Sequence, residues 1–369
     1  MAKRGAWAEI KLRALRENIK NIRSCVKNGA KFCAVVKADG YGHGAITVAR
    51  EAVAQGADYL AVAVLGEAVE LREAGFTTPV LILGGSQLED AGTIVDYDIT
   101  QAVFTLEAAE ALSRAAVERG KKVKVHLAVD TGMGRIGVRP EAAGEIAAKI
   151  AALPNVELEG MFSHFALADA VDKTYAHEQF KRFQLAMQKV EEAGVKLAIR
   201  HIANSAAILE MPETHLDMVR AGVILYGLWP SDEVEHVIEL KQVMEVKARF
   251  TYVKDLHPGE SVSYGCTFTA DKEMQLATLP LGYADGYTRL YAGKAVVELN
   301  GERRPIVGRI CMDQCMADVT GTGAKPGDTV TIFGSETLTT DEAAGWLGTI
   351  NYEIVCMMSP RLPRVYTER

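Results

Sequence analysis

The sequence predicts an α/β protein with an N-terminal (β/α)8 TIM-type barrel followed by a mostly β C-terminal domain. Short apolar runs alternate with amphipathic segments over the first part of the chain. After about Pro230 this alternation stops, and short β-rich runs punctuated by glycine and proline follow. A chain of 369 residues is long enough for two domains. We therefore expect residues 1–234 to form the barrel and residues 235–369 to form the β domain.

The barrel strands are predicted from apolar runs of strand length. The eight candidates are Phe32–Lys37, Tyr59–Val64, Val80–Gly84, Gln101–Phe104, Val123–Val129, Leu158–His164, Ala198–Asn204 and Met218–Tyr226. Between them lie segments with apolar residues at helical spacing, such as Leu106–Arg119 and Thr174–Ala193. Eight strand–helix units favour a closed barrel. A doubly wound sheet is the alternative, but Gly40-x-Gly42-x-Gly44 lacks the G-x-G-x-x-G spacing of that fold.

The strands of the second domain are predicted from β-rich runs bounded by turn residues. The candidates are Val243–Phe250, Gln275–Leu279, Ala295–Leu299, Arg304–Val307 and Thr329–Phe333. Cys311 and Cys315 are spaced C-x3-C in a strand-like stretch, which would place both on one face of a strand. A zinc site needs further ligands that the sequence does not supply there, so we expect no metal.

Composition and charge exclude several classes of protein. The net charge is −7 with no strong basic block, so we expect neither nucleic acid nor an acidic membrane surface as a partner. No apolar run is long enough to span a bilayer, and the N-terminal residues show no secretory signal. Six cysteines without secretory context indicate free thiols in a reducing compartment. The sequence therefore predicts a cytoplasmic protein.

The stretch FCAVVKADGYGHG places a lysine at the end of a buried apolar run. Lysine is rarely buried without a partner or a chemical role. A desolvated lysine shifts its pKa and can form a Schiff base with a carbonyl compound. The glycines that follow Lys37 would let the backbone approach a ligand closely. The alternative is a surface lysine in an ordinary turn between a strand and a helix.

Polar side chains follow several other predicted strands, and in a barrel these strand ends share the face that carries active sites. They are Asp130 and Arg135 after the fifth strand, His164 on the sixth, Ser205 after the seventh and Arg220 on the eighth. Each has a structural alternative. His164 could be a core histidine, Asn204–Ser205 could cap a helix that starts at Ala206, and Arg220 could pair with Asp217. Their location at one end of the barrel favours a shared site.

Motifs along nearly the whole chain resemble the alanine racemases, a fold-type III family that depends on pyridoxal 5'-phosphate (PLP). The motifs are VVKADGYGHG, WAEIKLRALRENI, DTGMGRIGV, FSHFALAD, HIANSAA, VRAGVILYG, SYGCTF, LGYADGY, GRICMDQ, NYEIVC and PRVY. The resemblance implies a barrel followed by a β domain. In this family the first strand, here near residues 7–11, often joins the β domain. The two domains therefore need not be divided at a single position in the chain.

The resemblance also implies roles for individual residues. Lys37 and Tyr264 match the two catalytic bases, and Lys37 also matches the lysine that forms the Schiff base with PLP. Positions that hold the cofactor phosphate are matched by Tyr41, Ser205, Gly222, Val223 and Tyr352. His164 and Arg220 match contacts to the pyridine ring, and Arg135 and Met312 match contacts to the substrate carboxylate. Tyr264 is contributed by the other subunit in the family, which implies a homodimer with shared active sites.

Two bases suit racemisation, because the α-proton must leave one face of the substrate and return to the other. Lysine and tyrosine both titrate near pH 10 when unperturbed, so desolvation or nearby cations must lower both pKa values. Arginine can only donate hydrogen bonds, so a ring nitrogen that faces Arg220 must stay unprotonated. This weakens the electron sink and favours return of the proton over transamination.

Two positions depart from the family pattern. One is Thr288 in ADGYTR, where proline is frequent, and it carries little weight. The other is Ala128. Many relatives carry a carbamylated lysine two residues before the aspartate of DTGMGR, and this chain has Ala128 there. Arg135 would then be a desolvated cation without its usual negative partner, which is costly for a buried charge. We expect an anion or an ordered water beside Arg135, and no carbamate.

The predicted function is interconversion of L-alanine and D-alanine, which supplies D-alanine for peptidoglycan. The sequence leaves open a serine, lysine or broad-specificity racemase or a basic-amino-acid decarboxylase on the same fold. It also leaves open a non-catalytic PLP-binding protein, although such chains are usually a barrel alone. Tyr352 favours alanine over serine because it would narrow the pocket around a small side chain.

Overall fold

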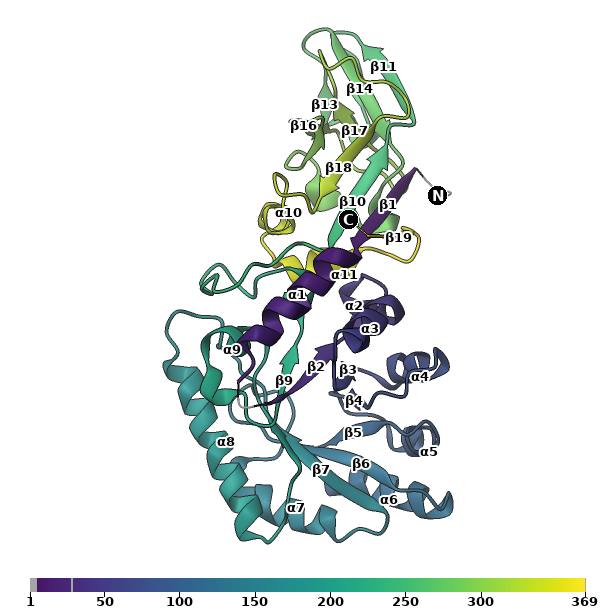
Figure 1. Cartoon of the computed structure of the whole chain (residues 1–369). Coiled ribbons are helices and arrows are strands. Elements are labelled where there is room, and N and C mark those ends of the chain that lie inside the picture. Colours follow the sequence, from purple (N-terminus) through teal and green to yellow (C-terminus); the bar gives the residue numbers. More distant parts are fainter. Residues whose placement is uncertain (1–4, 28, 369) are drawn as a thin grey trace.

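The computed structural model describes residues 5–27 and 29–368. It consists of a barrel and a β domain, with the N-terminal helix α1 (Leu12–Cys25) running from one to the other (Figure 1). Ile19 and Ile22 on the inner face of this helix are fully buried. The side chain of Asn18 bonds to the backbone of Leu225 and Lys241, so the helix also fixes the chain where it leaves the barrel.

The barrel is a single parallel sheet of eight strands in the order β8-β7-β6-β5-β4-β3-β2-β9. The strands are β2 (Lys31–Val35), β3 (Tyr59–Val62), β4 (Val80–Ile82), β5 (Thr100–Val103), β6 (Val123–Ala128), β7 (Val156–Phe162), β8 (Ile199–His201) and β9 (Met218–Ala221). Backbone hydrogen bonds from Asp217 to Arg200 and from Arg220 to Ala203, both 3.1 Å, bring the first and last strands of this order together. The predicted barrel is confirmed.

Helices cover the outside of the barrel (Figure 1). They are α3 (Ala45–Ala54), α4 (Leu65–Glu73), α5 (Ala91–Asp96), α6 (Leu106–Glu118), α7 (Ala143–Ala151), α8 (Thr174–Glu192) and α9 (Ser205–Glu210). Their ends follow local capping rules. Thr105 caps α6, and the Asn204 side chain accepts a hydrogen bond from the amide of Ala207 to cap α9, which begins one residue earlier than predicted.

The predicted barrel strands extend too far at their C-terminal ends. The strand expected at Phe32–Lys37 ends at Val35, because residues 38–42 adopt left-handed backbone angles that no strand can hold. The strand expected at Met218–Tyr226 ends at Ala221, and a 3-10 helix, η4 (Val223–Tyr226), follows. Functional side chains therefore lie on the turns just beyond the strands.

The β domain is built on a sheet of nine strands in the order β11-β14-β17-β16-β15-β18-β10-β1-β19. These are β1 (Ala6–Lys11), β10 (Met244–Arg249), β11 (Tyr252–Leu256), β14 (Met274–Leu279), β15 (Val296–Leu299), β16 (Glu302–Val307), β17 (Cys315–Asp318), β18 (Thr329–Phe333) and β19 (Arg364–Thr367). A separate pair, β12 (Ser261–Val262) and β13 (Phe268–Thr269), and the helices α10 (Thr340–Leu347) and α11 (Asn351–Met357) complete it.

Strand β1 comes first in the chain but pairs with strands of the β domain, antiparallel to β10 and parallel to β19. The pairing with β19 sets the first and last strands of the chain side by side. The prediction that Cys311 and Cys315 share a strand is wrong. Only Cys315 lies in β17, because Cys311 belongs to a tight turn closed by its amide and the carbonyl of Gln314.

Candidate active site

A cavity of about 600 Å³ lies at the C-terminal ends of the barrel strands and is closed on one side by α11. All eight residues that the sequence analysis assigned to the cofactor line it: Lys37, Tyr41, His164, Ser205, Arg220, Gly222, Val223 and Tyr352. A smaller cavity of about 70 Å³ shares Lys37, His164 and Arg220 with it and extends to Ala128 and Arg135. One chain therefore gathers most of the predicted site.

Lys37 lies two residues beyond the end of β2 and is half-buried. Burial lowers the pKa of its amine, and the positive charges of Arg135 and Arg220 lower it further, while the Glu67 carboxylate opposes the change. Within the described part of the chain, the Lys37 amine forms no ion pair. A larger share of this amine is therefore neutral near pH 7 than for an exposed lysine, as a nucleophile or base requires.

The backbone at Gly222 forms one wall of a cradle for a small anionic group. A Cβ atom at Gly222 would lie 3.0 Å from the Tyr41 hydroxyl and 3.5 Å from the Ser205 hydroxyl, so both hydroxyls converge on this point. The Gly222 amide donates to the Ser205 hydroxyl at 3.1 Å. Val223 opens η4 immediately after strand β9. The loops after the last two barrel strands are where phosphate binds in many barrels, so these residues fit the phosphate of PLP.

Arg220 is buried at the end of β9, and its guanidinium donates to four neutral acceptors among the described residues. It donates to the backbone carbonyls of Ser163 and Ile202, and to Nδ1 of both His201 (2.8 Å) and His164 (3.2 Å). Burial lowers the pKa of Arg220 to about 10, so it stays protonated near neutral pH. The alternative pairing with Asp217 is wrong, because Asp217 pairs with Arg200 at 2.6 Å on the outside of the barrel.

A buried hydrogen-bonded relay runs from Arg220 through the barrel interior. His201 Nε2 lies 2.9 Å from His126 Nδ1, and His126 Nε2 lies 3.1 Å from the Glu159 carboxylate. Because His201 Nδ1 accepts from Arg220, its proton must lie on Nε2 and point to His126. His126 in turn must donate to Glu159. Burial lowers the pKa of both histidines, so each is neutral and holds a single tautomer.

His164 faces the cavity rather than the core. It is partly exposed, and its Nδ1 accepts from Arg220. Burial lowers its pKa to about 3, and the charges of Arg220, Arg135 and Lys37 act in the same direction. A neutral imidazole here can pack against an aromatic ring, and it adds no positive charge to those of Arg220, Arg135 and Lys37.

Three predicted site residues lie outside the main cavity of a single chain. Tyr264, on the 3-10 helix η5 (Tyr264–Cys266), is 68% exposed, and Met312 is 51% exposed. Their loops contact each other, because the Ser263 hydroxyl donates to the Arg309 carbonyl at 2.6 Å. Arg135 is also exposed and lines only the small cavity. The premise that Arg135 is a desolvated cation is therefore wrong for one chain.

Ala128 lies in an apolar environment. It is 2% exposed and packs with Ala102, Phe162, Leu83 and Phe104. Ala128 also lines the small cavity, to which it contributes only an apolar methyl group.

Sequence reasoning missed the residues that support the site from behind: Glu67, His126, Glu159 and His201. A signal for the relay was present in β6, where Lys124 and His126 alternate with Val123, Val125 and Leu127. A strand with polar side chains on one face inside a barrel indicates a polar interior. No local sequence pattern marks Glu67 as a functional residue.

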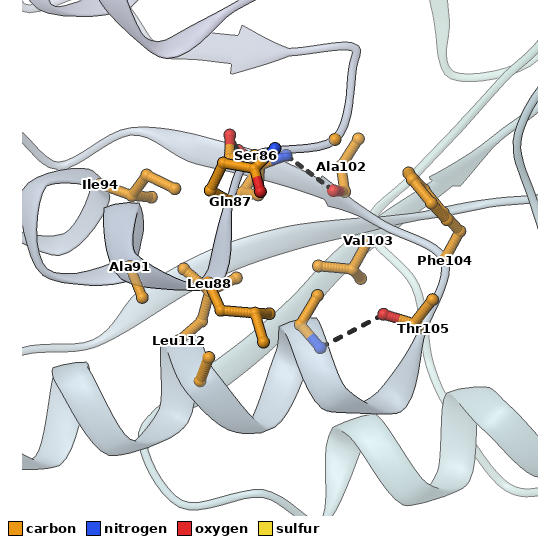
Figure 2. Close-up of a pocket in the computed structure, with 14 residues that line it drawn as sticks. Ser86, Gln87, Leu88, Ala91, Ile94, Ala102, Val103, Phe104, Thr105 and Leu112 are labelled. Carbon is orange, nitrogen blue, oxygen red and sulfur yellow. Dashed lines mark hydrogen bonds between the residues drawn. The ribbon is translucent and has the colours of Figure 1, made fainter.

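A further cavity of about 110 Å³ lies between β5 and helices α5 and α6 (Figure 2). It is lined mainly by apolar side chains, among them Leu88, Ile94, Val103 and Leu112, and carries none of the predicted site residues. Without a charged or titratable lining side chain it offers no acid–base chemistry. The larger cavity is therefore the candidate active site.

Comparison with known proteins identifies the family. The family described as "Alanine racemase, N-terminal domain" matches residues 10–230, and "Alanine racemase, C-terminal domain" matches residues 243–366. An alanine racemase of Desulfovibrio desulfuricans is 56% identical over 366 residues, covering 99% of each chain. One of Desulforamulus reducens is 51% identical, covering 98% of each.

Solved structures agree with these matches. The alanine racemase of Clostridium difficile 630 superposes with a TM-score of 0.97 at 42% identity, covering 100% of this chain and 97% of the other. The alanine racemase of Bacillus anthracis, solved with bound L-Ala-P, gives a TM-score of 0.94 at 35% identity, covering 100% and 96%. With both family domains matched in order along the chain, and relatives this similar over its full length, the chain belongs to the alanine racemase family.

Proposed function

We propose that this protein is a PLP-dependent alanine racemase that interconverts L-alanine and D-alanine. One observation carries the proposal beyond family membership. A lysine with a lowered pKa, a buried arginine and a cradle formed by Tyr41, Ser205 and Gly222 line a single cavity. A non-catalytic barrel would not need the β domain that closes this cavity through Tyr352.

In this proposal different residues bind different parts of the cofactor. Tyr41, Ser205, Gly222, Val223 and Tyr352 hold the phosphate, and His164 and Arg220 contact the pyridine ring. When bound, PLP supplies the electron sink that accepts the charge left by removal of the α-proton. The guanidinium of Arg220 can only donate hydrogen bonds, so the ring nitrogen facing it would accept and stay unprotonated.

The chain's own residues move the proton. Lys37 Nζ, neutral in part because its pKa is lowered, accepts or returns the α-proton on one face of the substrate. The Tyr264 hydroxyl acts on the opposite face. Arg135 and Met312 hold the substrate carboxylate, so the α-carbon stays between the two bases while its configuration inverts.

The exposure of Tyr264 and Met312 supports a homodimer with shared active sites. Neither residue lines the main cavity of its own chain, and both lie on contacting loops of the β domain. In the proposed dimer these loops complete the cavity of the second subunit. This arrangement would bury two side chains that one chain leaves in solvent.

Subunit mixing tests the shared site. Lys37→Ala and Tyr264→Ala are each expected to be inactive alone. A mixed dimer contains one site with both residues intact, so random exchange should restore about one quarter of the wild-type activity. No recovery after exchange has been demonstrated by mass would favour a site built within one chain.

A side-by-side racemisation assay tests the substrate. Alanine, serine and lysine are offered at equal concentration to the cofactor-loaded protein, and loss of optical rotation is followed. We expect the largest kcat/KM for alanine, because Tyr352 narrows the cavity. A larger value for serine would move the assignment to a serine or broad-specificity racemase, and release of carbon dioxide would indicate a decarboxylase.

We also propose that the D-alanine formed serves peptidoglycan synthesis and that the protein acts in the cytoplasm. Its six cysteines form no disulfide, as in a reducing compartment. No helix in the described ranges is long and apolar enough to cross a membrane. With Ala128 in place of lysine, no carbamate can form there, so activity should be independent of bicarbonate.

A further inference from the structure

Residues 38–42 form a left-handed turn directly after Lys37. The φ angles of Ala38, Asp39, Gly40, Tyr41 and Gly42 are 52°, 53°, 61°, 52° and 77°. Three of these residues are not glycine, and L-residues rarely adopt such angles in succession. Local preference therefore does not explain the turn, and the surrounding structure must hold it. Because Lys37 precedes the turn and Tyr41 is part of it, the turn sets where both side chains point.

The carboxylate of Glu67 holds the turn from the barrel side. One oxygen accepts from the Ala38 amide at 2.6 Å, and the other accepts from the amides of Ala63 (2.8 Å) and Val64 (3.3 Å). Glu67 lies in the first turn of α4, which follows the neighbouring strand β3. A single side chain thus connects the residue after Lys37 to the start of α4.

Arg364 holds the turn from the side of the β domain. Its Nε donates to the Gly42 carbonyl at 2.9 Å, and its two terminal nitrogens donate to the carbonyls of Met358, Ser359 and Leu362 at 2.6–2.7 Å. These acceptors are all backbone oxygens. Arg364 therefore acts as a fixed bridge between the turn and the C-terminal segment rather than as one half of an ion pair.

The backbone of α11 packs directly against the same turn. A Cβ atom at Gly42 would lie 2.3 Å from the Val355 carbonyl oxygen, so a side chain at this position would displace the helix. Within the turn, His43 Nδ1 lies 2.8 Å from the Tyr41 carbonyl and 3.1 Å from the Gly40 carbonyl. The turn is thus held from α4, from the C-terminal segment and from within.

We propose that Glu67 and Arg364 are positioning residues that hold the left-handed turn, and through it place the Lys37 amine in the cavity. Neither residue lines the cavity, so neither can act by touching the cofactor or the substrate. The inference rests on the role proposed above for Lys37. It adds that the C-terminal segment of the β domain fixes a barrel residue within the same chain.

Glu67→Gln and Arg364→Lys test the proposal, with Glu70→Gln as the matched control. Glu67→Gln would keep the length of the side chain but leave only one oxygen that can accept hydrogen bonds. Arg364→Lys would keep the positive charge but lose the planar guanidinium with its several donors. Glu70 is exposed one turn further along α4. We expect kcat to fall in both test variants, by up to about a hundredfold, with a smaller change in KM. The control should match wild type.

A second readout follows the lysine itself. The protein is loaded with limiting PLP and treated with borohydride, and the fraction of the Lys37 peptide that carries the adduct is measured by mass spectrometry. We expect this fraction to fall in both test variants while the thermal midpoint shows that each is folded. The double variant should lose less than the sum of the two single effects, because both residues hold the same turn.

The outcomes separate the two proposals. If wild type carries no adduct on Lys37, the role of Lys37 is wrong and the positioning proposal falls with it. If wild type is labelled normally and both folded variants match Glu70→Gln in adduct fraction and kcat, the positioning proposal alone is wrong. Should a variant not fold, amide exchange in wild type decides, because fast exchange of the Ala38 amide would overturn its bond to Glu67.

Discussion

Replacing Glu159 by glutamine is expected to destabilise the barrel from its interior. The carboxylate is 7% exposed and accepts hydrogen bonds from the Tyr59 hydroxyl (2.6 Å), Lys124 Nζ (2.5 Å) and His126 Nε2 (3.1 Å). Glutamine has nearly the same shape, but its single amide oxygen cannot accept from three donors and it carries no charge. The variant therefore removes the anion that ends the relay from Arg220 while leaving the packing almost unchanged.

The pKa of Glu159 indicates the size of the effect. Burial alone would raise this pKa, but the hydrogen bonds from His126, Lys124 and Tyr59 together outweigh burial and lower it from 4.5 to about 2. At ~1.4 kcal/mol per pKa unit, this corresponds to about 3.5 kcal/mol of stability. Lys124 is 42% exposed, so solvent screening reduces the contribution to roughly 2–3 kcal/mol.

The sign of the pH dependence follows from the lowered pKa. A carboxyl group whose pKa is lower in the folded than in the unfolded state stabilises the fold above the unfolded value of 4.5. This contribution is lost as the pH falls from there towards the folded value. The difference in stability between wild type and Glu159→Gln should therefore be full at neutral pH and shrink in acid.

Thermal unfolding followed by circular dichroism measures this difference. At neutral pH we expect Glu159→Gln to melt roughly 4–10 °C below wild type, and the gap should narrow as the pH approaches about 3. Glu157→Gln is the matched control, because Glu157 lies on the same strand but is exposed. The reasoning is refuted if both variants melt alike, or if the gap stays constant throughout the acid range.

Three further predictions concern the cavity. Borohydride reduction of the loaded protein should place the cofactor on the Lys37 peptide, and an adduct on another lysine would contradict the assignment. Tyr264→Phe should slow single-turnover exchange of the α-proton in deuterated water mainly from one enantiomer of alanine, whereas equal loss from both would argue against bases on opposite faces. Ser205→Ala removes a cradle hydroxyl and the acceptor of the Gly222 amide, so a titration of the cofactor-free protein should show about tenfold weaker PLP binding. Ser24→Ala, an exposed serine on α1, is its control, and equal affinity of both variants would remove Ser205 from the phosphate site.

The architecture of the barrel was predictable because its signal is repeated. Buried parallel strands give continuous apolar runs, and all eight were found between amphipathic segments. Their ends were not predictable in the same way. Residues 38–42 contain ordinary residue types, and the left-handed turn is imposed by Glu67, Arg364 and α11, which are distant in sequence. A pattern of single residues carries no information about such contacts.

The residues of the site also divide into those that the sequence predicts and those that it does not. Residues that touch the cavity follow strand ends and occur in dense motifs, so their positions could be predicted together. The residues behind them depend on which side chains meet across the barrel. His126 and His201 are 75 positions apart in the chain, yet their ring nitrogens lie 2.9 Å apart. The two histidines lie on β6 and β8, which both pair with β7, and this strand order brings their rings together. The relay therefore could not be derived from either strand alone.

In the proposed dimer the β domain contributes to catalysis in two different ways, which would explain why its residues divide into buried and exposed groups. Its last elements, α11 and β19, close the cavity of their own chain through Tyr352 and fix the turn beside Lys37 through Arg364. Its far loops present Tyr264 and Met312 to solvent. If those loops complete a second subunit, each β domain holds the lysine of one site and supplies the tyrosine of the other. Loss of the dimer would then remove one base from every site while leaving each lysine in place.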